Sequence, residues 1–208
     1  MNLSFNQYRA IDMTIMAVLL AISEAIVTIA ATQWFPDELF SVSTTLAIVC
    51  IVMMRWDGFA VVHAVLGGGV YCLVLGATPQ QFAIYCAGNC GALIALIMFK
   101  AIGKKKIAEK FWLSFLYVLV AYIGLELGRW GISMILQSVG EDGASGLLIY
   151  LMVSDSITLL FAVLAVMISR KLDGLFEDQR SYILRINEEQ RKEREAREKE
   201  NDWGNNLY

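Results

Sequence analysis

Six long apolar runs occupy the first 170 residues, and they constrain the fold more than any other feature of the sequence. Those 170 positions hold only 19 charged residues, whereas 18 of the chain's 37 (17 basic and 20 acidic) lie between Lys171 and Asp202. An apolar helix of roughly 20 residues crosses a bilayer, and only internally hydrogen-bonded backbone is stable in lipid. We therefore predict an all-α integral membrane protein and exclude a secreted disulfide scaffold, a nucleic-acid-binding protein and a soluble enzyme.

The apolar runs predict six transmembrane helices. Their ranges are Met13–Ala31, Leu39–Met54, Gly58–Gly76, Phe82–Phe99, Phe111–Leu136 and Leu147–Ser169. The second range is short for a full span, so we expect it to lie partly inside the bundle. The fifth range is long enough to tilt.

Lysine and arginine residues alternate between the predicted loops in a way that sets the topology. They occur near the N-terminus, at Arg55, within residues 100–110 and from Arg170 onward, whereas the three other loops have none. Positively charged loops stay on the cytoplasmic side. Both termini are therefore predicted to be cytoplasmic, in a multi-pass protein of a bacterial inner or plasma membrane.

The chain divides into two predicted units. Residues 1–170 form a six-helix membrane domain that binds the substrate, and residues 171–208 form a cytoplasmic helical tail. Apolar residues of the tail recur at helical spacing up to Ile186, and favourable i,i+4 pairs such as Glu188 and Lys192 follow. Two interpretations of the tail stay open: a solvated helix without a partner, and a helix that docks onto one.

Motifs for covalent chemistry are missing from the sequence. A phosphate-binding loop around Gly103 and Lys104 would need a serine or threonine at position 105, where Lys105 stands. The four cysteines lie inside predicted spans, and His63 is the one histidine. We therefore interpret the cysteines as small buried apolar residues and predict no metal site. We predict a protein that is not an enzyme, with no catalytic residues and no cofactor.

Ionisable residues inside a membrane are energetically expensive, so each is a functional candidate. The predicted spans hold Glu24, Glu126, Arg129 and Asp155, all near the middle or the outer half of the membrane. Glu126 and Arg129 are three residues apart on one helix face and could pair with each other. Arg129 could instead bind a ligand, and pairing would still leave Glu24 and Asp155 unexplained.

Polar and aromatic residues collect at the same depth as these charges. They predict an outer-facing pocket for a small polar ring, with aromatic faces for stacking and a few groups for hydrogen bonding. The residues are Thr28, Trp34, Tyr85, Asn89 and Trp130, with Ser41, Ser43, Thr44 and Thr45 beside them. An ordinary interfacial aromatic belt is the alternative, and it explains Trp34 better than Asn89.

Small residues repeat every fourth position on three predicted helices, which lets helix backbones approach closely in lipid. One stripe is Ala17, Ala21 and Ala25, a second runs over residues 83–95, and a third is Gly124 and Gly128. Packing within the bundle explains such stripes, and one of them could instead face another protein.

Over residues 8–170 the chain resembles the substrate-binding S component of an energy-coupling factor (ECF) vitamin transporter. The size, the six helices and the cytoplasmic ends match, and the AxxxA pattern at Ala17, Ala21 and Ala25 resembles the docking motif of that family. The stretch AIVCIVMMRWDGFAVVHAVLGGGV resembles thiamine-type members, and GATPQQFAIYCAGNCGAL resembles the start of the family's fourth helix. The tail after Lys171 is longer and more charged than the family pattern.

The resemblance implies a component of an ATP-driven importer for a small water-soluble vitamin or cofactor precursor. The substrate would enter from outside beneath a lid at residues 33–39, a transmembrane T component would dock on the alanine stripe, and two cytoplasmic ATPases would power release. The candidate substrate-binding residues are Glu24, Thr28, Trp34, Tyr85, Asn89, Glu126, Arg129, Trp130 and Asp155.

A thiamine-related substrate is the expectation that follows from the resemblance. If Arg129 pairs with Glu126, the remaining acids favour a cationic or hydrogen-bond-donating substrate. If Arg129 is free, a carboxylate or phosphate becomes a candidate.

Two other interpretations stay open. A non-catalytic scaffold could recruit a cytoplasmic partner through the tail, in which case deleting residues 187–208 abolishes function while Glu24 and Asn89 tolerate change. The transporter hypothesis predicts the reverse. A membrane-embedded enzyme is the third interpretation, and the lone His63 offers it little acid–base chemistry.

Overall fold

The computed structural model describes residues 4–34, 40–137 and 141–205, and every regular element in these ranges is a helix. Four helical stretches are long and apolar enough to cross a membrane: Phe5–Trp34, Thr45–Leu75, Pro79–Ala101 and Phe111–Leu136. A fifth is reached if the bent pair Ser145–Ser154 and Ser156–Ser169 counts as one span. The chain thus has the helices of a multi-pass membrane protein.

The stretch from Thr45 to Leu75 reverses direction in its middle. It consists of α2 (Thr45–Trp56), a single 3₁₀ turn η1 (Asp57–Ala60) and α3 (Val61–Leu75), and Asp57 has a positive φ of 54° at the turn. A Cβ on Gly67 would lie 2.2 Å from the hydroxyl of Thr45, so the first residue of α2 lies against the middle of α3. The two helices are therefore antiparallel neighbours, as the second and third apolar runs predicted.

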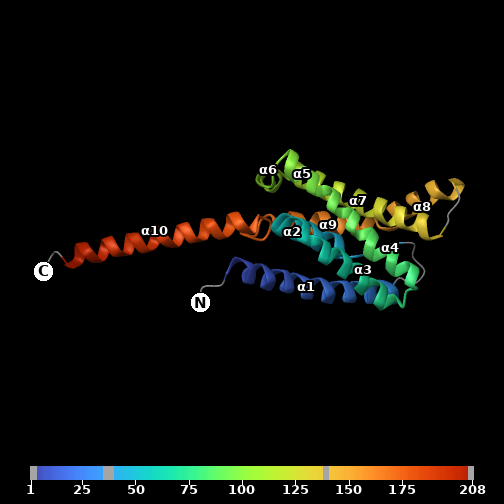
Figure 1. Ribbon diagram of the computed structural model, residues 1–208, viewed down its shortest axis with the longest axis horizontal. Helices are drawn as coiled ribbons and strands as arrows, with labels where there is room; N and C mark the ends of the chain where they lie inside the picture. The colour runs from blue at the N-terminus through green and yellow to red at the C-terminus, as the bar shows by residue number, and fades with distance from the viewer. Residues whose placement is uncertain (1–3, 35–39, 138–140, 206–208) are drawn as a thin grey trace.

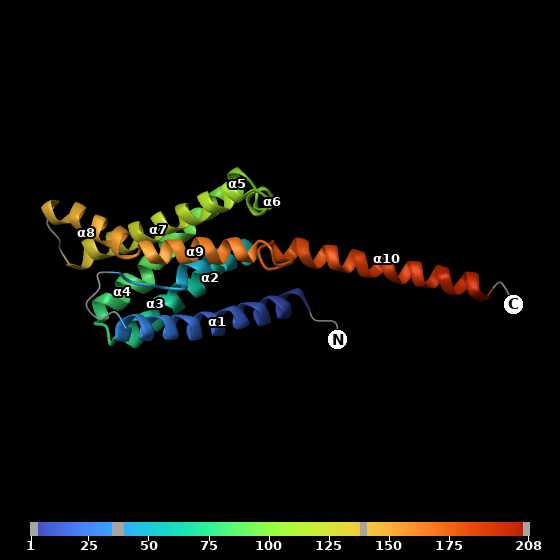
Figure 2. The ribbon, with the colours of Figure 1, turned by 180° about the vertical axis from the view of Figure 1, so that it is seen from behind.

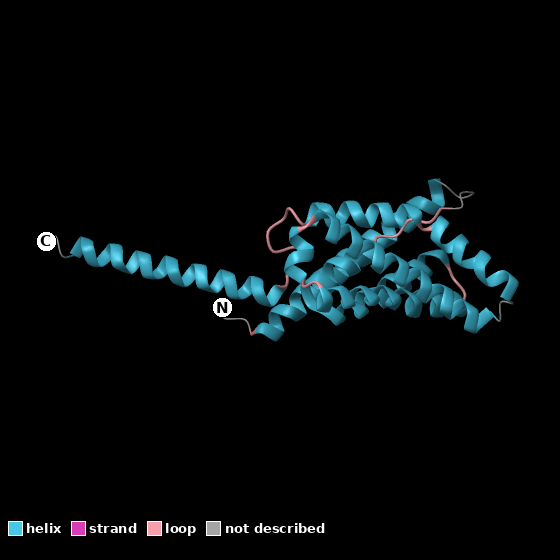
Figure 3. Ribbon diagram, turned by 90° about the horizontal axis from the view of Figure 1, so that it is seen from above, coloured by secondary structure: helices cyan, strands magenta, loops and turns pink. Residues whose placement is uncertain are grey.

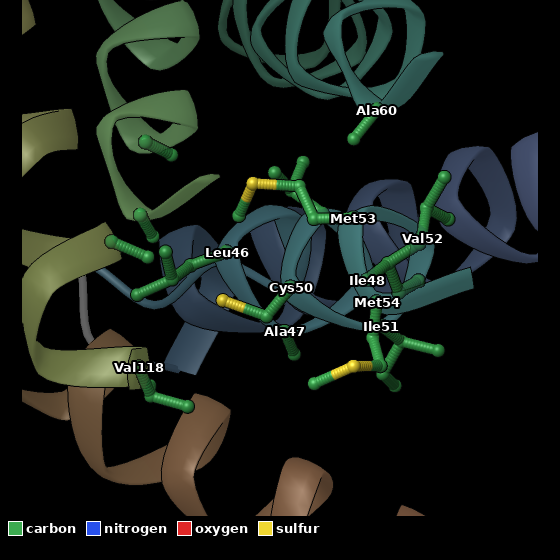
Figure 4. Packing of buried hydrophobic residues seen from close by; sticks show 14 of the residues in the cluster. Leu46, Ala47, Ile48, Cys50, Ile51, Val52, Met53, Met54, Ala60 and Val118 are labelled. Atoms are coloured by element: carbon green, nitrogen blue, oxygen red, sulfur yellow. The ribbon is translucent and has the colours of Figure 1, made fainter. Parts of the chain in front are cut away.

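Helix α2 is enclosed by the rest of the bundle. All twelve of its residues are buried, which confirms the expectation that this short run lies inside. Twelve residues span about 18 Å, well short of the roughly 30 Å hydrocarbon layer. Figure 4 shows its side chains, including Leu46, Cys50 and Met53, packed among the neighbouring helices together with Val118. The core of the molecule is built around this helix.

The fourth apolar run forms one continuous helical stretch, in which the helix type changes along the chain. It begins with α4 (Pro79–Gly88), tightens to a 3₁₀ helix η2 (Asn89–Ala95) and ends as α5 (Leu96–Ala101). Thr78 and Gln81 form a capping box at its start, with Pro79 in the first turn, a combination that starts helices because it satisfies free amide groups. The short α6 (Lys104–Glu109) follows.

Helix α7 (Phe111–Gln137) packs backbone to backbone against this run. A Cβ on Gly128 would lie 2.2 Å from the carbonyl oxygen of Gly88, and one on Gly91 would lie 2.1 Å from the carbonyl oxygen of Gly124. Both glycines of the GxxxG pair are thus used for packing within the chain. By contrast, Ala17, Ala21 and Ala25 are half-buried on α1 (Phe5–Trp34).

The sixth apolar run is bent, although the sequence predicts one helix over Leu147–Ser169. Helix α8 (Glu141–Ser154) and helix α9 (Ser156–Ser169) meet at Asp155 with a bend of 47°. The amide of Ser41 donates to the carbonyl of Ser154 at 2.9 Å, and the amide of Ser43 donates to the hydroxyl of Thr158 at 3.0 Å. The segment before α2 therefore satisfies polar groups at the break, as a buried break requires.

The basic segments of the chain lie together at one end of the bundle. Figure 1 shows the start of α1, helices α5 and α6 and the start of α10 (Gln179–Asn205) at this end, with α8 at the other. We call the end that holds α5, α6 and the start of α10 the basic end. Seen from behind and from above, α10 leaves the basic end and projects away from the bundle (Figures 2 and 3).

Candidate binding site

Of the four ionisable residues predicted inside the membrane, Arg129 meets two others, Glu126 and Asp155. Its Nη1 lies 3.3 Å from Oε1 of Glu126 on the same helix and also donates to Oδ2 of Asp155 at the α8–α9 break. These three residues are at most 4% exposed. Of the two possibilities that the sequence left open for Arg129, the structure thus has the pair with Glu126, and Arg129 pairs with Asp155 as well.

Asn89 and Tyr85 complete the surroundings of the guanidinium. Nε of Arg129 donates to Oδ1 of Asn89 at 2.9 Å, and the amide nitrogen of Asn89 donates to the carbonyl of Ala64. The guanidinium carbon lies 4.7 Å from the centre of the Tyr85 ring, a cation–π distance. We call Arg129, Glu126, Asp155, Asn89 and Tyr85 the Arg129 cluster.

Close backbone contact between two helices brings this cluster together. A Cβ on Gly88 would lie 2.6 Å from Cα of Arg129, so only glycine lets α4 approach α7 at this level. The next residue after Gly88 is Asn89, which binds Arg129. The hydroxyl of Ser41 donates to Oδ1 of Asp155 from the segment before α2. Three separate parts of the chain therefore supply the cluster, and the segment before α2 contacts it through Ser41.

Glu24 is buried at a different corner, between α1 and the start of α2. Its Oε2 accepts hydrogen bonds from the amides of Thr44 and Thr45, at 2.7 and 3.0 Å, and from the hydroxyl of Thr44 at 2.8 Å. The first amides of a helix lack partners within the helix and carry a partial positive charge. Glu24 thus caps α2 from a neighbouring helix. This role could not be predicted from the sequence, because nothing in the chain order links residue 24 to residues 44 and 45.

Several buried polar atoms have no hydrogen-bond partner among the described residues. Two are carboxylate oxygens, Oε1 of Glu24 and Oε2 of Glu126, and two are the hydroxyls of Thr28 and Thr45. Thr28 lies one helical turn beyond Glu24 on the buried face of α1. Thr45 adjoins Glu24 through its amide. We call Glu24, Thr28 and Thr45 the Glu24 corner.

The remaining predicted residues are placed as follows. Trp34 is the last residue of α1 and is 73% exposed. Residues 35–39 of the predicted lid, including Phe35, lie outside the described residues. Trp130 is half-buried on α7, next in sequence to Arg129. Tyr71, another aromatic residue of the predicted pocket, lies with its ring centre 4.8 Å from that of Tyr85.

A cavity of about 780 Å³ lies at the basic end, away from the predicted pocket. The cations that line it already have partners: Lys104 pairs with Asp57 and Asp178, and Arg185 pairs with Asp173 and Glu177. Arg170 donates to backbone carbonyls of residues 108 and 109. This lining favours a structural cavity over an anion-binding site.

No group of three or more histidine, cysteine, aspartate or glutamate side chains in the described ranges is arranged to hold a metal ion. Comparison of the chain with protein-family models, with curated proteins and with solved structures finds no match.

Proposed function

We propose that this chain is the membrane-embedded substrate-capturing component of an ATP-driven importer of the ECF type. Its cargo is a small water-soluble vitamin or cofactor precursor, with a thiamine-related compound as the first candidate. The observation that carries the proposal is the buried polar centre formed by the Arg129 cluster and the Glu24 corner. Charged groups buried in a membrane bundle are expensive and are retained for function.

The proposed topology has six crossing segments with both termini in the cytoplasm of a bacterial cell. Six segments result when α2 and α3 are counted separately and the bent α8–α9 pair is counted as one; α2 is the segment that is too short to cross alone and is enclosed by the others. The gathering of Arg55, Lys104 and the start of α10 at one end supports the orientation. The buried polar centre then faces the outer half of the membrane.

The chain's own residues would bind and orient the substrate without covalent chemistry. Tyr85 supplies an aromatic face, Asn89 supplies an amide, and the carboxylates of the centre supply acceptors. Association with the T component would use the half-buried alanine stripe of α1 at residues 17–25. Two cytoplasmic ATPases would supply the energy for release inside.

Ligand-induced stabilisation tests this function directly. The full-length protein in detergent is heated with each member of a panel of water-soluble vitamins and precursors, since a ligand at 100 times its Kd stabilises the folded state by roughly 2.7 kcal/mol. We expect one saturable hit that Asn89→Ala weakens, and uptake of the same compound when the chain is co-expressed with a T component and the ATPases. Absence of both binding and uptake across the panel contradicts the proposal.

A scaffold that recruits a cytoplasmic partner is the second candidate function. The observation that favours it is the projection of α10 away from the bundle, with residues 187–197 exposed along the helix. Deleting residues 187–208 separates the two functions. The deletion leaves vitamin binding and uptake intact if the chain is a substrate-capturing component, and it abolishes partner capture if the chain is a scaffold.

A further inference from the structure

We propose that the ligand of this site carries a cationic or amino nitrogen, and that the Glu24 corner binds it. The inference rests on the proposed function and names the substrate class. Buried carboxylates in proteins are nearly always paired with a cation. Glu24 is 0% exposed and has no ion pair among the described residues.

Only one of the two oxygens of the Glu24 carboxylate accepts hydrogen bonds from the described residues. Oε2 receives three hydrogen bonds from the start of α2, whereas Oε1 has no partner within the described ranges. The capping role therefore explains the position of the side chain but leaves one oxygen available. A donor on the ligand would complete it.

Two hydroxyl groups next to this carboxylate are also unused. The Thr28 and Thr45 side chains are 2% and 0% exposed, and neither hydroxyl has a partner among the described residues. Thr45 lies against Gly67 of α3, where a larger residue would displace it. One carboxylate oxygen and two hydroxyls together suit a nitrogen that donates several hydrogen bonds, since all three oxygens can accept them.

The Arg129 cluster disfavours the opposite choice, an anionic ligand. Arg129 is held by two carboxylates, by Asn89 and by the face of Tyr85. A carboxylate or phosphate would have to compete with Glu126 and Asp155 for the same guanidinium. With Glu126, Asp155 and Glu24 against one arginine, the formal charge of the centre is −2 with all four groups ionised, and a cationic ligand reduces this imbalance.

Pairs of vitamins that differ in one group test the inference. The probes are pyridoxamine against pyridoxine, which differ in an amine, and thiamine against the anions pantothenate and biotin. Sodium chloride against N-methylglucamine chloride tests for an inorganic cation, because the same oxygens would also accept one. Each probe is titrated against the full-length protein in detergent, and the shift in Tm gives the apparent Kd.

Three variants assign the binding to residues. Glu24→Gln keeps an oxygen for the α2 amides but removes the negative charge, and we expect it to weaken a cationic probe about tenfold or more. Thr28→Val removes an unpartnered hydroxyl, so it should weaken binding several-fold while leaving the Tm of the ligand-free protein unchanged. Thr14→Val is the matched control, because Thr14 is exposed on the same helix and bonds only its own turn.

The outcomes separate this inference from the proposed function. A cationic or amino probe that binds better than its neutral or anionic match, and loses affinity in Glu24→Gln but not in Thr14→Val, supports both. A tight anionic or neutral hit leaves the importer standing and overturns the inference. So does a cationic hit that Glu24→Gln binds as well as the wild type does, or stabilisation by sodium alone. No shift with any organic probe overturns the inference, and absence of binding and uptake across the whole vitamin panel overturns the importer as well.

Discussion

The two ends of the bundle each hold a buried arginine. The two arginines differ in whether the charges around them balance and whether every neighbouring polar atom has a hydrogen-bond partner. At the basic end, Arg55 holds Asp12 of α1 with Nε at 3.0 Å and Nη2 at 2.5 Å, and its Nη1 donates to the carbonyl of Gly174 at 2.6 Å. Trp56 donates to the same carboxylate. We call Asp12, Arg55, Trp56 and the Gly174 carbonyl the basic-end joint.

In the basic-end joint the charges balance and the guanidinium nitrogens have acceptors, whereas the buried centre at the other end has excess negative charge and unpartnered oxygens. Each nitrogen of the Arg55 guanidinium has an acceptor, and one carboxylate balances one guanidinium. At the other end, the carboxylates outnumber the guanidinium and two of their oxygens lack partners within the described residues. A balanced cluster of this kind joins structural elements, here α1, α2 and the segment before α10. An unbalanced buried one is a candidate for ligand binding.

The largest effect is expected from removing the cation of the unbalanced centre. Arg129→Met leaves Glu126 and Asp155 buried side by side without a counter-charge, and breaking a buried ion pair in this way costs about 3–5 kcal/mol. We expect a large fall in Tm in detergent, or no folded protein. The double variant Arg129→Met with Asp155→Asn should recover part of the loss. An unchanged Tm in the single variant would show that the cluster contributes nothing to the fold.

The basic-end joint should respond more to geometry than to charge. Arg55→Lys keeps a positive charge but loses the planar fork that binds Asp12 and Gly174 at once. We expect a destabilisation of about 1–3 kcal/mol, the range for losing hydrogen bonds to a charged group, with vitamin binding unchanged. Arg191→Lys, on an exposed arginine of α10, is the control. A lysine variant as stable as the wild type would contradict the comparison.

Much of the fold could be predicted from the sequence, because the hydropathy of each segment and the charge of each loop are known without any information about contacts. The runs that form α1, α4–α5 and α7 and the buried position of α2 were predicted, and so was the grouping of Arg55 with the lysines near 104. The bend at Asp155 could not be predicted, because it depends on Ser41, a partner 114 residues away.

The residue types of the site were predictable, and the spacing offered the Glu126–Arg129 pair as one possibility, but the contacts between different helices were not predictable. The cost of burying charge in lipid singled out Glu24, Glu126, Arg129 and Asp155 without any contact information. The contact between Asn89 and Arg129 depends on the close approach at Gly88, and the role of Glu24 depends on where α2 begins. Both are consequences of tertiary packing, which spacing along one helix does not encode.

A moderate effect is expected at the start of α2. Glu24→Ala removes the acceptor from the first amides of a buried helix, and loss of a helix N-terminal acceptor costs about 0.5–2 kcal/mol. Glu24→Gln should retain most of this stability, since its amide oxygen can still accept. Thermal unfolding of the two ligand-free variants measures the difference. Equal losses in both would mean that the charge of Glu24, and not its acceptor oxygen, supports α2.

The smallest effect is expected from the half-exposed ion pair between Asp178 and Lys104, which belongs to the basic end. Burial alone would raise the pKa of Asp178, but the hydrogen bond and charge of Lys104 outweigh it and hold that pKa below its usual 3.8. A carboxyl group with a lowered pKa in the folded state stabilises the fold above its unfolded pKa. That contribution disappears as the pH falls through the folded-state pKa.

Asp178→Asn should therefore destabilise the protein near pH 7 by at most about 1 kcal/mol, because such pairs are screened by solvent. The difference in Tm between wild type and variant should shrink as the pH is lowered below 3.8. Asp173→Asn is the control, since the Asp173 side chain is 72% exposed in its pair with Arg185. A difference in Tm that grows as the pH falls would mean that the surroundings of Asp178 disfavour its charged form. The basic end, like the centre opposite it, would then hold a carboxylate without sufficient counter-charge.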